Sequence, residues 1–292
     1  MPNSVHHRIQ ALPLWQGPVT IAPLGGGRTN LNFMVGDDSG RYVVRLGADI
    51  PAHHVMRFNE LAASRAAHAA GLSPEVVFAQ EGLSVLRYID SKTLAEPDVA
   101  LPCYLPRIVA LMRRCHHDIP AHLRGPVLMF WVFHVIRDYA AWLTEQASPY
   151  APRLPEFLTI AEKLEAAIGP IVPVFGHNDL MAANILDDGT RLWLIDWDYA
   201  GYNTALFDLG GLASNNALTE AQELEMLELY YEKPADLALL KRYHAMKCAS
   251  LLREVMWSMV SEAISGLDID YAAYTAENLT RFTRAYEAYK QS

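Results

Sequence analysis

The amino-acid sequence predicts an α+β fold in two lobes, a small antiparallel sheet followed by a larger helical part. Three observations predict it. Short apolar runs separated by turn residues fill the segment 21–89, helical spacing of apolar residues dominates from residue 101 onward, and strand-like residues return only in the segment 172–197. We therefore divide the chain into residues 1–88 and 89–292, and we expect a ligand to bind in the cleft between them.

The first lobe is predicted to consist of antiparallel hairpins with one helix inserted. Turn-forming residues separate its apolar runs, as in chains that fold back on themselves through tight turns. The predicted strands are Ile21–Leu24, Phe33–Val35, Tyr42–Leu46, Val76–Phe78 and Ser84–Ile89. His53–Ala70 is Ala-rich with helical spacing, and Gly71 is expected to end this helix because glycine readily adopts the left-handed conformation of a C-terminal cap.

The second lobe is predicted to be mainly helical. The periodicity of apolar residues indicates helices over residues 105–117, 127–147, 155–168, 204–214, 219–231, 234–263 and 270–290. Within this lobe, Val172–Trp197 reads as strand, loop, short strand, turn and strand, with the turn at Asp187–Gly189. Polar residues in that segment would be held by a small sheet set among helices.

Composition and charge exclude several classes of function. The formal net charge is −9 and no basic stripe is present, which argues against a nucleic-acid partner and modestly favours a cationic ligand.

The longest apolar run, Val127–Phe133, is too short to span a bilayer, and the N-terminal residues lack the apolar core of a signal peptide. Three cysteines without a CxxC spacing suit neither a disulfide framework nor a zinc site. We expect a cytoplasmic protein without a membrane partner. A homodimer is compatible with the sequence, which leaves the oligomeric state open.

The segment 172–197 carries the residues that phosphoryl transfer requires. His177 and Asp179 are followed by Asn184, five residues after the aspartate, and Asp196 comes at the end of the next apolar run. In such a reaction one carboxylate accepts or orients the proton of the attacking hydroxyl, while a carboxamide and a second carboxylate hold Mg²⁺ on the nucleotide phosphates. A lone His-Asn-Asp is more often a polar turn, but the joint spacing favours catalysis by Asp179.

A glycine-rich turn in the first lobe suits nucleotide phosphates. Gly25, Gly26 and Gly27 are followed by Thr29, Asn30 and Asn32, between two predicted strands. Glycines allow backbone N–H groups to approach phosphate oxygens closely. No GKS or GKT occurs in the chain, so this is not a Walker A loop. Taken alone, the three glycines could also form a simple hairpin turn.

One basic residue lies within an apolar strand of the same lobe. Arg45 needs a partner there, and Glu60 on the following helix could provide it and leave the guanidinium to hold phosphates. The alternative is a salt bridge that touches no ligand. The hinge is predicted at Arg87–Asp90, where the backbone around Arg87 and Ile89 would contact the adenine.

These motifs resemble those of the aminoglycoside phosphotransferase and choline kinase superfamily, which has a protein-kinase-like fold. The resemblance extends from about Leu24 to Tyr286 and is greatest to bacterial choline/ethanolamine kinase-like proteins. The HxDxxxxN pattern and the downstream metal aspartate of the family match the chain residue by residue, as do its nucleotide loop and its basic strand residue, here an arginine. On this resemblance, Asn184, Asp196 and Asp198 are expected to be the metal ligands. ATP and Mg²⁺ are the expected cofactors.

The resemblance also implies a substrate, a small cationic alcohol such as choline or ethanolamine. Tyr202, Trp257 and Tyr274 are candidates for an aromatic wall against an ammonium group, although aromatic residues on helices are as often core. Choline kinases carry an aromatic residue where this chain has Glu254, and a glutamate where it has Asn215. The acidic partner of the substrate is therefore expected to be Glu254.

The sequence thus predicts a kinase that transfers the γ-phosphate of Mg-ATP to a small alcohol. Two alternatives remain open: a kinase for another alcohol, such as an aminoglycoside, thiamine or a sugar alcohol, and a nucleotide-binding scaffold without turnover. A protein kinase is disfavoured, because no APE-type activation segment follows Asp196.

Overall fold

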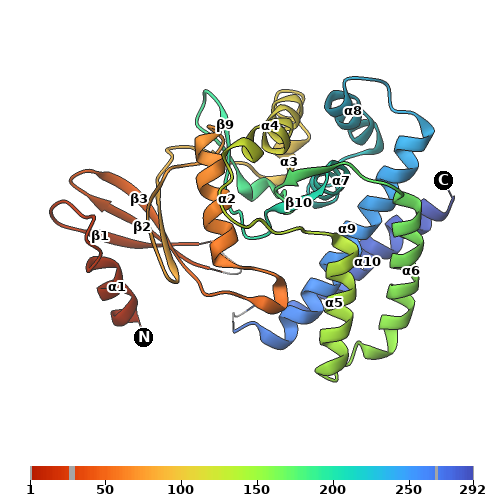
Figure 1. Ribbon diagram of the computed structural model, residues 1–292, viewed down its shortest axis with the longest axis horizontal. Coiled ribbons are helices and arrows are strands. Elements are labelled where there is room, and N and C mark those ends of the chain that lie inside the picture. The colour runs from red at the N-terminus through yellow and green to blue at the C-terminus, as the bar shows by residue number, and fades with distance from the viewer. Residues whose placement is uncertain (1, 26–29, 267–268, 292) are drawn as a thin grey trace.

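The computed structural model describes residues 2–25, 30–266 and 269–291. It confirms the predicted α+β architecture. A five-stranded antiparallel sheet with strand order β1-β2-β3-β5-β4 forms one end of the molecule, and a bundle of helices forms the other (Figure 1). None of the helices in these described ranges is both long and apolar enough to cross a membrane.

The N-terminal sheet is built from hairpins, as expected. Its strands are β1 (Thr20–Leu24), β2 (Leu31–Asp37), β3 (Gly40–Leu46), β4 (Val76–Gln80) and β5 (Leu83–Arg87). The β2–β3 turn is fixed by Asp37, whose Oδ1 accepts hydrogen bonds from the backbone N–H groups of Ser39 (2.8 Å) and Gly40 (3.1 Å). The inward-facing Val35, Val44 and Val85 are fully buried. Alternating burial of this kind is how a sheet that is covered on one face gains its stability.

Two helices complete this lobe. Helix α1 (Pro2–Gln10) was not predicted, because the segment is polar apart from a few residues. Ile9 is completely buried in the core that packs against the sheet. Tertiary contact therefore stabilises a helix that the apolar pattern of this segment does not predict. Helix α2 (Arg57–Ala69) begins four residues later than expected, after a short 3₁₀ turn at Pro51–His53. Gly71 ends it as predicted, with φ at 72° and its N–H donating to the carbonyl of His68.

The C-terminal lobe contains every helix that was predicted for it, and also the short helix Glu96–Val99, which was not predicted. They are α3 (Glu96–Val99), α4 (Leu105–Asp118), α5 (Val132–Glu145), α6 (Leu154–Ile168), α7 (Ala205–Asn215), α8 (Glu220–Tyr231), α9 (Leu237–Ile264) and α10 (Tyr271–Gln291). Helix α9 has 28 residues, packs against α5, α6, α7 and α10, and is buried along most of its C-terminal half. Its length, about 42 Å at 1.5 Å per residue, brings its C-terminal half to the first lobe (Figure 1).

The C-terminal lobe also contains two small sheets. One pairs β7 (Pro173–Gly176) with β10 (Gly201–Thr204), and the other has the order β6 (Lys92–Thr93), β8 (Ile185–Asp187), β9 (Leu192–Leu194). β6 and β10 were not predicted, because Lys92–Thr93 and Gly201–Thr204 contain no run of apolar residues. Extended backbone at Met129 pairs with Tyr202, which explains why the helix predicted from residue 127 begins only at Val132.

Candidate functional site

A cavity of about 320 Å³ separates the N-terminal sheet from the β8–β9 hairpin. It brings together seven of the predicted nucleotide and metal residues, namely Gly25, Asn32, Arg45, Arg87, Ile89, Asn184 and Asp196. Apolar side chains, including Val43, Leu186 and Ile195, line it as well. Gly26, Gly27 and Thr29 lie outside the described residues. The cavity has apolar walls for a planar base at the hinge and polar groups at its inner end.

The loop that carries Asp179 is held by a buried carboxylate. Asp208, near the start of α7, accepts the backbone N–H groups of His177 (2.8 Å) and Asn178 (2.7 Å), and it also contacts Nε2 of His116 at 2.9 Å. Asn178 has a left-handed backbone with φ at 64°, and its side-chain amide donates to the Tyr199 carbonyl. These bonds fix the loop before any ligand binds. Sequence analysis did not identify this role of Asp208, because the contact joins segments thirty positions apart.

Asp179 lies in a recess between the loop, α7 and α9. The recess encloses about 10 Å³, roughly the space of one water molecule, and its polar lining includes Asn215, Arg253 and Glu254. Removal from water raises the pKa of Asp179 to about 7; the Arg253 charge opposes this rise, and the Glu254 carboxylate adds to it. A carboxylate with a pKa near neutrality suits proton acceptance from a hydroxyl.

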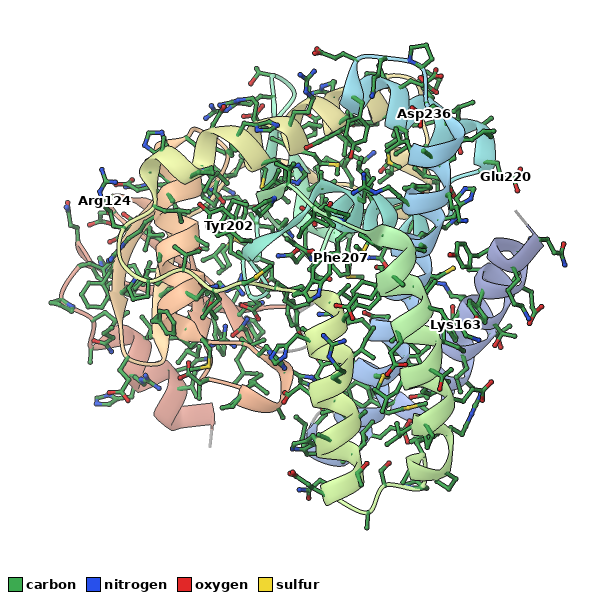
Figure 2. The ribbon with its side chains drawn as sticks, turned by 45° about the vertical axis from the view of Figure 1, so that its right-hand side comes forward. Arg124, Lys163, Tyr202, Phe207, Glu220 and Asp236 are labelled. Carbon is green, nitrogen blue, oxygen red and sulfur yellow. The ribbon has the colours of Figure 1, made fainter. Side chains whose placement is uncertain are left out.

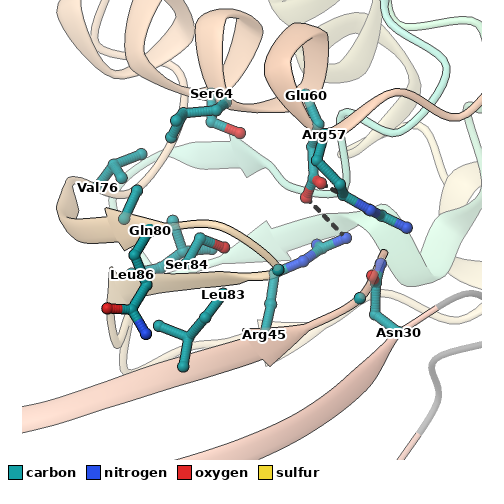
Figure 3. A pocket seen from close by; sticks show the side chains of 14 residues that line it. Asn30, Arg45, Arg57, Glu60, Ser64, Val76, Gln80, Leu83, Ser84 and Leu86 are labelled. Atoms are coloured by element: carbon teal, nitrogen blue, oxygen red, sulfur yellow. Dashed lines mark hydrogen bonds and ion pairs between the residues drawn. The ribbon is translucent and has the colours of Figure 1, made fainter. Parts of the chain in front are cut away.

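Arg45 is at the centre of a buried network of charges. Its Nη2 lies 3.1 Å from Glu60, which is the predicted pair, and 2.8 Å from Asp196. Figure 3 shows the Glu60 carboxylate between Arg45 of β3 and Arg57 of α2. Burial favours a raised pKa for Asp196, but the charge of Arg45 outweighs it and holds the pKa below its ordinary value. Arg45 thus contacts a carboxylate that is also a predicted metal ligand.

Asp198 belongs to this buried network and not to the cavity surface. Its carboxylate pairs with Arg45 (3.2 Å) and with Arg57 (2.8 Å), and it accepts a hydrogen bond from Asn30 (3.2 Å). The side chain is buried and does not line the nucleotide cavity. Its position differs from that expected of a metal ligand and suits an anchor for the two arginines. Sequence analysis missed Arg57, which begins α2 and pairs with Glu60 one helical turn later at 2.6 Å.

The residues around Asp196 fit a magnesium ion that is shared with phosphates. Asn184 donates through Nδ2 to the backbone carbonyl of Asp179 at 2.9 Å, which leaves its amide oxygen for another ligand. Asn32 Oδ1 is buried beside the cavity without a hydrogen-bond partner among the described residues. The described ranges hold no cluster of three or more His, Cys, Asp or Glu that could bind a metal. This set of oxygen donors is typical of Mg²⁺ sites, in which the protein supplies one or two oxygen ligands and phosphates and water supply the others.

The predicted substrate residues separate into two groups. Glu254 and Asn215 line the Asp179 recess. Tyr274 joins them, because its hydroxyl donates to Glu254 Oε1 at 2.7 Å. Trp257 instead lines a neighbouring cavity of about 280 Å³, together with His53, Ser261 and Tyr271.

Tyr202 does not belong to either of these cavities. It lies on β10, where Figure 2 labels it, and packs edge-to-face against Phe175 of β7. It is not among the residues that line the two cavities. The expectation that it forms part of a substrate wall is therefore corrected. Its ring is partly buried against the core because β10, which the sequence did not reveal, pairs Tyr202 with Phe175 of β7.

Comparisons with known proteins identify the family of this site. A model of the phosphotransferase enzyme family (APH) matches residues 20–243. The chain belongs to that family. The protein LicA of Haemophilus influenzae is 26% identical over 85% of this chain and 75% of its own length, and a probable ethanolamine kinase of Arabidopsis thaliana is 25% identical over 93% and 79%. The crystal structure of a choline/ethanolamine kinase family protein from Mesorhizobium loti superposes with a TM-score of 0.79 at 27% identity, covering 100% of this chain and 95% of that one.

This phosphotransferase is an ATP-dependent small-molecule kinase with a protein-kinase-like fold. The resemblance that the catalytic motif predicted is thereby confirmed, and the acceptor is a small alcohol. In such an enzyme the chain itself performs little covalent chemistry. Its residues align the two substrates and stabilise the charge on the transferred group.

Substitution of Glu60 by glutamine tests the network around Arg45. The change removes the negative charge that orients Arg45 and Arg57. The KM for the nucleotide should therefore rise at least about threefold, whereas the KM for the alcohol should change less. Steady-state kinetics with each substrate varied in turn measures both values. Glu165→Gln is the matched control, because it breaks a similar pair with Arg137 (2.7 Å) on distant helices. A rise confined to the KM of the alcohol would contradict the assignment of Arg45 to the nucleotide.

Proposed function

We propose that this kinase transfers the γ-phosphate of Mg-ATP to the hydroxyl of a small cationic amino alcohol, with ethanolamine and choline as the leading candidates. The observation that carries the proposal is the recess beside Asp179, in which Glu254 places a carboxylate close to the catalytic base. A molecule with a hydroxyl at one end and an ammonium at the other can reach both carboxylates. The names of the relatives, which include ethanolamine and choline kinases, support the same acceptor class.

Asp179 takes the role of the base in this proposal. It orients the acceptor hydroxyl and receives its proton as the new bond to phosphorus forms. The Asp208 contacts hold its loop, so that little rearrangement is needed when the acceptor arrives. The recess has space for about one water molecule, so only the reacting end of an acceptor can enter it.

The nucleotide would lie in the 320 Å³ cavity, with its base at Arg87–Ile89 and its phosphates toward Arg45. Asn32 and the glycine segment that includes Gly25 would complete the phosphate contacts. Asn184 and Asp196 would hold Mg²⁺, which when bound offsets the negative charge of the phosphates. Arg45 would exchange Asp196 for phosphate oxygens, and Glu60 would keep its guanidinium oriented.

A panel of acceptors tests the proposed function. Purified protein is incubated with Mg-ATP and ethanolamine, choline, thiamine, a sugar alcohol or an aminoglycoside, and O-phosphorylated product is quantified by mass spectrometry together with ADP release. We expect product with at least one of the two amino alcohols. Turnover of another acceptor class alone would contradict the substrate assignment, and absence of any product would favour the scaffold alternative.

Replacement of Glu254 by glutamine tests the acidic end of the acceptor site. The kcat/KM for ethanolamine should fall at least about tenfold, and that for choline should fall less, because only the primary ammonium donates hydrogen bonds to the carboxylate. Glu262→Gln is a suitable control on the same helix, since that carboxylate accepts a hydrogen bond from Tyr150 (2.9 Å) and does not line the recess. If both substrates lost activity equally, Glu254 would have a structural role only.

A further inference from the structure

The recess that holds Asp179 is lined in part by a buried arginine. Arg253 lies on α9 directly before Glu254, is only 4% exposed, and lines the recess with Asp179. Its Nη1 donates to Glu254 Oε2 at 3.0 Å. Its guanidinium carbon lies 4.4 Å from the ring centroid of Tyr199 and 5.4 Å from that of Phe130. The protein therefore supplies a cation of its own, stacked on aromatic rings at the acceptor site.

The other aromatic faces near the recess are also covered. Trp257 is stacked against His53, with ring centroids 5.0 Å apart and an interplanar angle of 24°, and its Nε1 donates to the Tyr199 hydroxyl at 2.7 Å. Tyr199 and Trp257 expose only 5% and 6% of their surfaces. Among the described aromatic side chains of this region, these two offer a ligand almost no open face. A quaternary ammonium binds mainly to aromatic faces, and protein side chains already cover the faces of these two rings.

Glu254 retains the capacity to bind a hydrogen-bond donor. Its two oxygens each accept one hydrogen bond, from Arg253 and from Tyr274. An ionised carboxylate has about four acceptor positions, so further donors can still be accommodated. The positive charge of Arg253, 3.0 Å from Glu254, partly cancels the charge attraction between Glu254 and a cationic ligand. Hydrogen bonds from ligand N–H groups to the Glu254 oxygens are still available.

We propose that Arg253 determines acceptor selectivity: by occupying the aromatic face of Tyr199 and sharing Glu254, it makes the kinase prefer a primary amino alcohol to its quaternary analogue. This inference rests on the proposed function, because it narrows the acceptor class from amino alcohols in general to those that retain N–H groups. Arg253 acts as a specificity-determining residue and not as a base or a phosphate ligand.

The N-methyl series of ethanolamine tests this inference. The kcat/KM values are measured for ethanolamine, its monomethyl and dimethyl derivatives, and choline. In the wild type, kcat/KM for ethanolamine should exceed that for choline at least about tenfold, with a stepwise decrease along the series, because each methyl group removes a donor to Glu254. In Arg253→Leu, the ratio of ethanolamine to choline should decrease at least about threefold, because the face of Tyr199 is freed.

Two further variants separate charge from packing. Arg253→Lys keeps a cation that can lie over the ring of Tyr199, and it should keep the ratio closer to the wild-type value than Arg253→Leu does. Arg242→Leu, on the same helix, removes an arginine that donates to the carbonyls of Ile168 and Pro170, far from the recess, and it should leave the ratio unchanged. Thermal melting and Mg-ATP affinity verify that each variant is folded.

Each result of these measurements bears on a different part of the inference. Choline turned over as well as ethanolamine by the wild type would overturn the inference and leave the proposed function intact, and this result needs no variant. The assignment of selectivity to Arg253 also fails if a folded Arg253→Leu protein keeps the wild-type ratio. If no member of the series is phosphorylated, the proposed function itself fails, and the inference with it.

Discussion

Replacing Asp179 by asparagine should lower kcat at least about 100-fold while Mg-ATP affinity stays within about threefold of the wild type. Asparagine has nearly the same shape, and the loop is held by Asp208 through the backbone of His177 and Asn178, so the geometry of the site should survive. What the variant loses is a group that can accept a proton from the acceptor hydroxyl. Single-turnover assays and calorimetric titration with Mg-ATP measure the two quantities separately.

A surface substitution of the same kind provides the control. Asp118→Asn removes a carboxylate that pairs with Arg114 on the exposed face of α4, and kcat should be unaffected. Turnover close to the wild-type rate in Asp179→Asn would remove Asp179 from the role of base. Loss of nucleotide affinity together with kcat would instead point to a collapsed site.

Asp196→Ala should abolish the part of ATP affinity that depends on Mg²⁺. The substitution deletes a carboxylate that lines the nucleotide cavity next to Asn184, so the ion loses one of its few protein ligands. Affinity for ATP in the presence of EDTA should be maintained or increased, because Arg45 is released from its 2.8 Å contact with Asp196 and becomes free for phosphates. Calorimetric titration of both proteins, with and without Mg²⁺, gives all four affinities.

The isosteric variant separates metal binding from the Arg45 contact. Asp196→Asn keeps a side-chain oxygen that can accept from Arg45 but removes the charge, and it should reduce Mg²⁺-dependent affinity nearly as strongly as alanine. If the alanine variant still shows the full gain in affinity on addition of Mg²⁺, the metal lies elsewhere. Asp198 would then be the first residue to test, although the structure pairs it with Arg57 outside the cavity lining.

The parts of the site that were predictable are those encoded by short segments. Local apolar patterns and turn residues predict the strand around Arg45, the loop from Asp179 to Asn184 and the strand that precedes Asp196. The Arg45–Glu60 pair was also predictable, since a charge on an apolar strand needs a partner and the next helix offers one. Gly71 ended its helix for a reason that is local to the backbone.

Other features depend on residues that are far apart in the chain. Arg57 meets Asp198 across 141 positions, and Trp257 meets Tyr199 across 58, so no local pattern indicates either contact. The contact of Tyr202 with Phe175 follows from β10, a strand that pairs with β7. Helix α1 likewise depends on the sheet that buries Ile9.

By itself, the sequence determined the α+β fold class and the placement of Asp179, Asn184 and Asp196 around one hairpin, because their spacing along the chain fixes which strands and turns carry them. Only the tertiary structure decided what surrounds them. Whether Glu254 faces a substrate or an internal partner depends on the packing of α9 against the catalytic loop and the core, and that packing places Arg253 over Tyr199. We therefore expect such long-range contacts to determine acceptor selectivity, since charge and aromatic surface act on a ligand only where folding leaves them uncovered.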